Sequence, residues 1–161
     1  MSTGPGRLQR ARGRFVATTR ALIWGGNGIR LLQNGDEYFP ALIAAIDGAR
    51  RTVFLETYIY AADNIGLRVY DALAEAASRG VAVHVVVDGF GSGQIADLLL
   101  ARLTAVGARV AVFRRAYWWR PDRRLLRRLH RKLAVIDDRV AFCGGINIID
   151  DHHHPGAERG L

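Results

Sequence analysis

The segment HRKLAVID, residues 130–137, places a histidine and a lysine beside a run of apolar residues. The apolar run predicts a strand. Alternate residues of a strand share one face, so His130 and Lys132 are expected on the same side, about 7 Å apart. A lysine holds the non-bridging oxygens of a phosphate as a point charge, and a histidine attacks phosphorus or transfers a proton. The pair therefore predicts a pocket for a phosphate-bearing anion, although an ordinary surface hairpin with charged ends fits the same two residues.

The residues that follow extend this candidate anion site. Asp137 has the opposite strand parity and is expected where the strand turns. Gly144 and Gly145 allow backbone N–H groups to approach a phosphate closely, and Asn147 carries an amide that donates to it. The stretches KLAVID and VAFCGG are predicted to be two strands joined by a tight turn.

Positive charge is concentrated in two segments of the 161-residue chain. Residues 1–20 hold five arginines and no acidic residue, and residues 114–132 hold eight arginines and one lysine against one aspartate. Elsewhere 9 of the 23 basic residues stand against 14 of the 15 acidic residues. Local basicity of this kind indicates contact with a polyanion or an anionic surface, and a solvated charged helix is the simpler alternative.

The basic segment 114–132 also contains aromatic residues, which leaves two binding partners open. On an anionic membrane, arginines supply attraction while Trp118 and Trp119 lie at the level of the headgroups. On nucleic acid, arginines meet phosphates and aromatic rings stack on bases. The arginines expected to make these contacts are Arg120, Arg123, Arg124, Arg127 and Arg128.

Strand and helix patterns alternate along the chain from residue 28. Strands are predicted at 28–33, 52–60, 81–89 and 108–114, and helices at 34–50, 64–80 and 94–107. The first helix is expected to begin at Asn34, because Glu37 follows at capping-box spacing. The nearly continuous β-branched run at 81–89 is typical of a strand covered on both faces. This alternation predicts a layered α/β domain with a partly parallel sheet.

Residues 1–28 are expected to be a basic, disordered tail, and residues 29–161 one domain. No apolar run approaches the roughly 18 residues that span a bilayer. The single cysteine, Cys143, has no partner for an internal disulfide, which indicates a reducing compartment, and its apolar neighbours predict a buried position. His84 is expected to be packed within a strand, and His152, His153 and His154 to form a polar loop rather than a metal site.

The segment HRKLAVIDDRVAFCGGIN resembles the HxKxxxxD signature of the phospholipase D superfamily, with its trailing GG-x-N. The stretches NGDEYFPALIAAIDGARRTVFLETYIY and LAEAASRGVAVHVVVDGFGS are similar to the N-terminal half of bacterial cardiolipin synthases, and the likeness covers roughly residues 29–151. Glu56, Asp88, Gly89 and Gly91 stand at recurrent acidic and glycine positions of that family. The resemblance implies a phospholipase D-like domain, with a mixed sheet flanked by helices and an incomplete C-terminus.

The resemblance also implies a two-step phosphatidyl transfer that makes cardiolipin from phosphatidylglycerol through a phosphohistidine, without a metal or other cofactor. Carried onto this chain, His130 is the nucleophile or its acid–base partner and Lys132 binds phosphate oxygens. Asp137 orients or electrostatically supports the histidines, while Asn147 and the backbone of Gly144 and Gly145 complete the anion site. Glu56 and Asp88 are either supporting residues or ordinary strand-end residues.

The family's active site uses two such motifs, from two halves of a chain or from two subunits, and this sequence contains one. The chain is therefore expected to be the N-terminal part of a two-motif enzyme, to have little activity alone, and to need a second motif from a missing half or a second subunit. It is expected on the cytoplasmic face of the bacterial inner membrane, as a peripheral protein. Two alternatives remain: a dimeric one-motif phosphodiesterase that acts on nucleic acid, and an inactive membrane-binding remnant.

Overall fold

The computed structural model describes residues 26–92, 95–114 and 128–150. The chain divides into two units, residues 1–31 and 32–161, and the second unit contains all the helices and strands described below. In chain order these elements are α2 (Asn34–Asp47), β1 (Thr52–Thr57), α3 (Asn64–Ser78), β2 (Ala82–Asp88), α4 (Ile95–Ala105), β3 (Arg109–Phe113), β4 (Leu133–Ile136) and β5 (Val140–Cys143).

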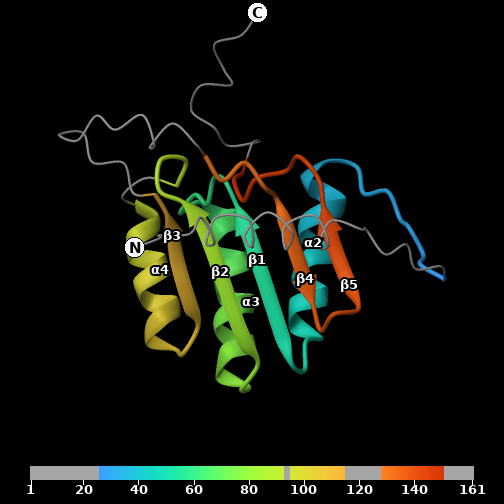
Figure 1. Cartoon of the computed structure of the whole chain (residues 1–161), viewed down its shortest axis with the longest axis horizontal. Coiled ribbons are helices and arrows are strands. Elements are labelled where there is room, and N and C mark those ends of the chain that lie inside the picture. Colours follow the sequence, from blue (N-terminus) through green and yellow to red (C-terminus); the bar gives the residue numbers. More distant parts are fainter. Residues whose placement is uncertain (1–25, 93–94, 115–127, 151–161) are drawn as a thin grey trace, which may run out of the picture. The chain divides into compact units, whose positions relative to one another are not determined.

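The five strands form one mixed sheet in the order β3-β2-β1-β4-β5 (Figure 1). The first three strands pair in parallel through the crossover helices α3 and α4, while β4 pairs antiparallel with both β1 and β5. The register pairs Glu56 near the end of β1 with Leu133 at the start of β4, and Leu133 in turn with Cys143 at the end of β5. One edge of the sheet therefore gathers the carboxyl ends of β1, β2, β3 and β5 with the start of β4. This arrangement confirms the predicted layered α/β fold with a partly parallel sheet.

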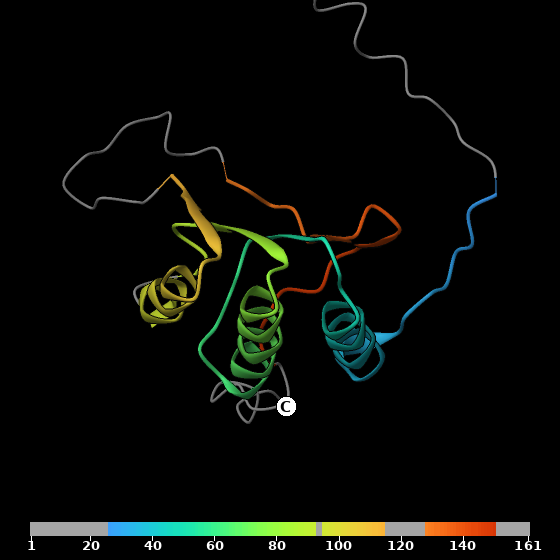
Figure 2. The ribbon, with the colours of Figure 1, turned by 90° about the horizontal axis from the view of Figure 1, so that it is seen from below.

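The hydrophobic core lies between the sheet and the three helices, which cover the same face (Figure 2). Buried and exposed positions alternate along β1, so that Val53 and Leu55 are buried while Phe54 is 41 % exposed. Val83, Val85 and Val87 continue the buried face in β2. Each fully buried side chain of this size contributes about 1.5–3 kcal/mol to the stability of the folded chain. The core therefore fixes the position of every strand whose end reaches the common edge.

The prediction that β2 is covered on both faces is wrong for the described part of the chain. All three described helices lie on one face, and the opposite face of β2 presents half-buried His84 and Val86. His84 stacks on Phe54 of β1, with ring centroids 4.7 Å apart and planes 17° from parallel. A run of β-branched residues indicates a strand but does not indicate how many faces of that strand are covered. Here the packing of the helices covers one face.

Two further predictions about local structure are wrong, and one is confirmed. Residues 28–33 form no strand. Helix α2 begins at Asn34 as expected, and its N-cap is Gln33, whose amide donates to the Glu37 carboxylate at 2.9 Å. Cys143 is exposed rather than buried, because β5 is the edge strand and its register puts Cys143 on the face opposite the helices.

Candidate active site

His130 and Lys132 lie side by side at the common edge of the sheet, just before β4. The ammonium Nζ of Lys132 is 3.1 Å from Nε2 of His130. An ammonium group only donates hydrogen bonds, so it bonds to Nε2 in the tautomer whose Nε2 carries the lone pair. In that tautomer a phosphate oxygen that takes over the Lys132 donor leaves the Nε2 lone pair free to act as a nucleophile.

Tyr58, which no sequence motif indicates, forms one wall of this site. Its ring centroid is 5.1 Å from that of His130, and Lys132 Nζ lies 5.4 Å above the same ring. Tyr58 follows directly after β1, which pairs with β4, so the sheet register brings it beside the two motif residues. The only sequence signal was an aromatic residue at the end of a predicted strand, which is too common to identify a site.

Lys132 is only 7 % exposed, yet the described residues give its charge no carboxylate partner. The ion pairs among these residues join Arg51 to Asp138 and Arg131 to Glu56. Burying a cation without a counter-ion is costly, so the site favours binding of an anion. The His130 ring lies directly beside this ammonium, with Nε2 3.1 Å from Nζ.

Glu56 does not contact His130 in this structure. Its carboxylate lies 3.3 Å from the guanidinium of Arg131, the residue between the two motif side chains. The Arg131 side chain is 70 % exposed, and an exposed pair of this kind contributes little to stability. The contact helps to orient the motif segment along the end of β1.

Asn147 and the two glycines lie at the same edge, but not all in the predicted role. The side-chain oxygen of Asn147 accepts a hydrogen bond from the amide of Ile59 at 3.2 Å, which ties the segment after β5 to the segment after β1. The amide of Gly144 donates to the Lys132 carbonyl at 3.3 Å, so it continues the β4–β5 pairing rather than pointing at a ligand. Gly145 is exposed, and an added Cβ there would meet nothing within 4 Å.

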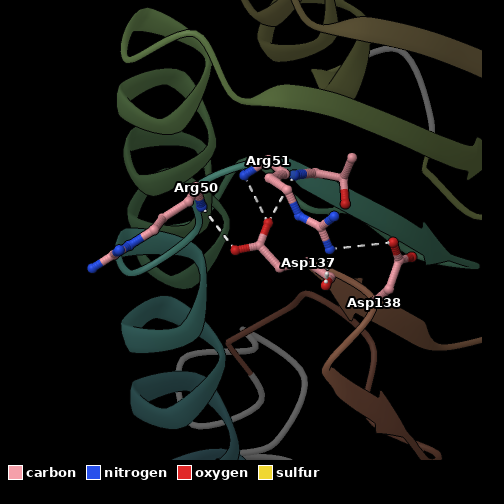
Figure 3. Close-up of polar contacts among 5 residues, drawn as sticks. Arg50, Arg51, Asp137 and Asp138 are labelled. Atoms are coloured by element: carbon pink, nitrogen blue, oxygen red, sulfur yellow. Dashed lines mark hydrogen bonds and ion pairs between the residues drawn. The ribbon is translucent and has the colours of Figure 1, made fainter.

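Asp137 directly follows the last residue of β4, whereas His130 precedes the first, and Figure 3 shows Asp137 beside Arg50 and Arg51. Its carboxylate accepts hydrogen bonds from the amides of Arg50 at 2.9 Å and of Arg51 and Thr52 at 2.8 Å. The whole of β4 lies between His130 and Asp137, and no contact between the two side chains is present among the described residues. The Asp137 side chain instead ties the turn between α2 and β1 to the end of β4.

The pKa of Asp137 is held below its ordinary value of 3.8, chiefly by the hydrogen bonds from the Thr52 and Arg50 amides and also by that from Arg51. These bonds favour the ionised carboxylate. The Arg51 side chain adds a hydrogen bond to the Asp137 carbonyl at 2.8 Å and an ion pair to Asp138 at 3.6 Å. The aspartate of the motif is thus a carboxylate that stabilises the fold.

A cavity of about 590 Å³ is lined by residues from the start of α2, the start of α3 and the segment after β5. Gly145 and Asn147 line it together with Asn34 and Arg68. The sequence does not reveal this cavity, because its walls come from three distant parts of the chain.

Several predicted residues lie outside the described part of the chain: Trp118, Trp119, Arg120, Arg123, Arg124, Arg127, His152, His153 and His154. Arg128 is described, and its guanidinium lies 4.5 Å from the Phe90 ring centroid. Within residues 26–92, 95–114 and 128–150, no group of three or more His, Cys, Asp or Glu side chains is arranged to hold a metal ion. None of the helices in these ranges is long and apolar enough to cross a membrane.

The fold and the site together define an α/β domain that presents a histidine–lysine pair, suited to an anion, at the carboxyl ends of its parallel strands. The chain belongs to the family described as "Cardiolipin synthase, PLD-like domain", whose profile matches residues 42–157. The recognition of this family from the HxKxxxxD segment is confirmed.

The chain is 43 % identical over 134 residues to cardiolipin synthase B of Salmonella typhimurium and 42 % identical to that of Escherichia coli K12. It is 32 % identical over 123 residues to cardiolipin synthase 1 of Bacillus cereus. These matches cover 79 %, 79 % and 76 % of this chain, but only 31 %, 31 % and 24 % of the three relatives. The chain therefore spans about a third or less of the length of the curated relatives that it matches.

Solved structures confirm the predicted fold class. Nuc from Salmonella typhimurium, a phospholipase D family member, matches with a TM-score of 0.54 and 21 % identity over 68 % of this chain and 64 % of its own. NucT from Helicobacter pylori matches with a TM-score of 0.52 and 21 % identity over 68 % and 66 %. At this identity the likeness concerns the fold alone.

Proposed function

We propose that this chain supplies one half of the active site of a phosphatidyltransferase that makes cardiolipin from phosphatidylglycerol. The observation that carries the proposal is the buried Lys132 ammonium, without a carboxylate partner among the described residues and 3.1 Å from Nε2 of His130. The identity of 43 % to a cardiolipin synthase B supports a lipid phosphodiester as the anion.

In the first step, Nε2 of His130 attacks the phosphorus of phosphatidylglycerol. The N–P bond forms and the P–O bond to the departing glycerol breaks, while Lys132 holds a non-bridging oxygen. The proton that the departing alkoxide needs comes from a general acid outside this site. In the second step, the hydroxyl of another phosphatidylglycerol attacks the phosphohistidine, the N–P bond breaks, and the same external group accepts the hydroxyl proton.

A second group is required because one histidine cannot be the phosphorylated nucleophile and the free acid at once. General acid–base assistance of this kind is worth roughly 10²–10⁴-fold in rate. The chain carries a single HxKxxxxD motif, and we propose that a second motif, from a further part of a longer chain or from another subunit, provides this group.

We further propose that the basic segment 114–132 binds the anionic membrane surface that holds the substrate, and that the protein lies peripherally on the cytoplasmic face of the bacterial inner membrane. Each arginine near an anionic leaflet contributes about 1 kcal/mol of attraction. The same arginines and aromatic residues can also bind nucleic acid. The experiment below therefore also tests the alternative of a dimeric one-motif phosphodiesterase that acts on nucleic acid.

The test is a chimera in which the aligned 79 % of this chain replaces the matching 31 % of Escherichia coli cardiolipin synthase B. The chimera is expected to convert labelled phosphatidylglycerol to cardiolipin, and His130→Asn is expected to abolish that conversion. His84→Asn is the matched control, because His84 stacks on Phe54 away from the motif edge. Retained turnover in His130→Asn contradicts the proposal, and hydrolysis of single-stranded DNA by the 161-residue chain without lipid transfer by the chimera favours the phosphodiesterase.

A further inference from the structure

A buried carboxylate two strands away from the motif holds the backbone immediately before His130. Asp88 is the last residue of β2, and its side chain is fully buried. Its Oδ2 accepts a hydrogen bond from the amide of Leu129 at 2.8 Å. Its Oδ1 accepts from the amides of Phe90 at 2.9 Å and Gly91 at 3.3 Å. One carboxylate thus joins the loop after β2 to the residue that precedes the candidate nucleophile.

The same loop also fixes the ring beside His130. The Ser92 hydroxyl donates to the Tyr58 carbonyl at 3.3 Å and accepts from the Tyr60 amide at 3.2 Å. Gly91 packs so closely on this segment that an added Cβ would lie 2.3 Å from the Tyr58 carbonyl oxygen. The loop therefore controls both the chain before His130 and the aromatic wall against which its ring lies.

A second contact between the loop and the motif segment involves Phe90. The guanidinium of Arg128 lies 4.5 Å from the centre of the Phe90 ring, a cation–π distance. Arg128 and Leu129 are consecutive, so two neighbouring residues of the approach to His130 are held by one loop. Charge-assisted hydrogen bonds are roughly twice as strong as neutral ones, so the Asp88–Leu129 bond attaches this segment strongly to the loop.

We propose that Asp88 is a positioning residue that sets the orientation of the His130 ring against Tyr58 and Lys132. The catalytic consequence rests on the proposed function, but the geometric effect on His130 does not. An asparagine at this position keeps the size of the side chain and loses one of the two acceptor oxygens, so it cannot accept from both sides. Either the Leu129 amide loses its acceptor, or the asparagine oxygen turns to Leu129 and the amides of Phe90 and Gly91 lose theirs.

The test uses the 161-residue chain with isotope-labelled histidine, and its readout is the ¹H shifts of the His130 ring, which the ring current of Tyr58 displaces at a centroid distance of 5.1 Å. His130→Asn identifies the signals. Asp63→Asn is the matched control, because Asp63 accepts from the amides of Gly66 at 2.8 Å and Asp150 at 2.6 Å and, among the described residues, does not contact the segment 128–132.

In Asp88→Asn, the His130 signals are expected to move toward the values of free histidine, while those of His84 stay in place. Asp63→Asn is expected to leave both unchanged. Unmoved His130 signals in a folded Asp88→Asn chain overturn the proposal, and so does an equal movement in both variants. A role in stability alone lowers the melting temperature without moving the His130 signals of the folded chain.

If Asp88→Asn does not fold, amide hydrogen exchange in the unchanged chain decides. The Leu129 amide is expected to exchange at least roughly 10-fold more slowly than in an unstructured peptide, and exchange at the peptide rate overturns the proposal. A parallel titration with inorganic phosphate separates the two proposals. If phosphate leaves His130 unaffected while Asp88→Asn moves it, the positioning role stands and the anion site fails.

Discussion

The carboxylate of Asp137 accepts a hydrogen bond from the backbone amide of Thr52 at 2.8 Å, and thereby joins the end of β4 to the start of β1 across 85 residues of sequence. The amides of Arg50 and Arg51 complete the same contact (Figure 3). A residue of the HxKxxxxD motif thus acts at one end of β4 on the fold, while His130 and Lys132 occupy the other end. The motif interval from His130 to Asp137 contains all of β4, so this strand connects the candidate active site to the hydrogen bonds of Asp137.

Replacing Asp137 with asparagine is expected to lower the melting temperature clearly, because an amide cannot supply the charged acceptor that three backbone N–H groups share. Asp138→Asn is the matched control, since Asp138 is next in sequence but makes only an exposed ion pair with Arg51. Thermal unfolding followed by circular dichroism checks this. Equal melting temperatures for the two variants would show that the Asp137 contact contributes nothing specific.

The contribution of Asp137 should depend on pH. The pKa of its carboxyl is lower in the folded chain than the ordinary 3.8, so its contribution to stability is present above that value and is lost as pH falls through the folded pKa. The difference in melting temperature between the parent and Asp137→Asn is therefore expected to be largest near neutral pH and to shrink in acid below about pH 4. A difference that grows on acidification would contradict the direction of the shift.

The basic segment is predicted to control membrane association. Changing Arg123, Arg124, Arg127 and Arg128 to glutamine removes four positive charges, each worth about 1 kcal/mol near an anionic leaflet. Binding to phosphatidylglycerol vesicles, measured by sedimentation across a salt series, should fall steeply. The charge-matched control changes four exposed arginines elsewhere, Arg50, Arg102, Arg109 and Arg139. If both variants bind equally well, the segment is not the membrane contact.

His130→Asn is predicted to leave the fold intact. His130 lies outside the hydrophobic core, where it contacts Tyr58 and Lys132, so its loss removes few packing contacts. The melting temperature of the variant should stay within a few degrees of the parent. A large fall in the melting temperature would contradict this prediction, and lost turnover in the variant would then not identify His130 as a catalytic residue.

The fold class and the His130–Lys132 pair could be predicted from the sequence because both depend on local patterns: strand and helix periodicity, and alternation along one strand. The hydrogen bonds of Asp137 could not be predicted, because the three amides that donate them belong to a turn more than eighty residues away in the sequence. Tyr58 could not be predicted for the same reason, since it reaches the site only through the pairing of β1 with β4. Asp88 was singled out as an acidic strand end, but its contact with Leu129 follows from the tertiary fold. The exposure of Cys143 depends on strand order, which apolar neighbours do not reveal.

The role of His130 as the nucleophile is measured most directly by a rapid acid-free quench of the cardiolipin synthase B chimera during turnover of phosphatidylglycerol, followed by mass spectrometry of its peptides. We expect a phosphatidyl group on the peptide that carries His130, absent from His130→Asn, which should also make no cardiolipin. Turnover with the phosphatidyl group on a histidine of the other part of the chimera, or continued turnover in His130→Asn, would contradict the assignment of His130 as the nucleophile.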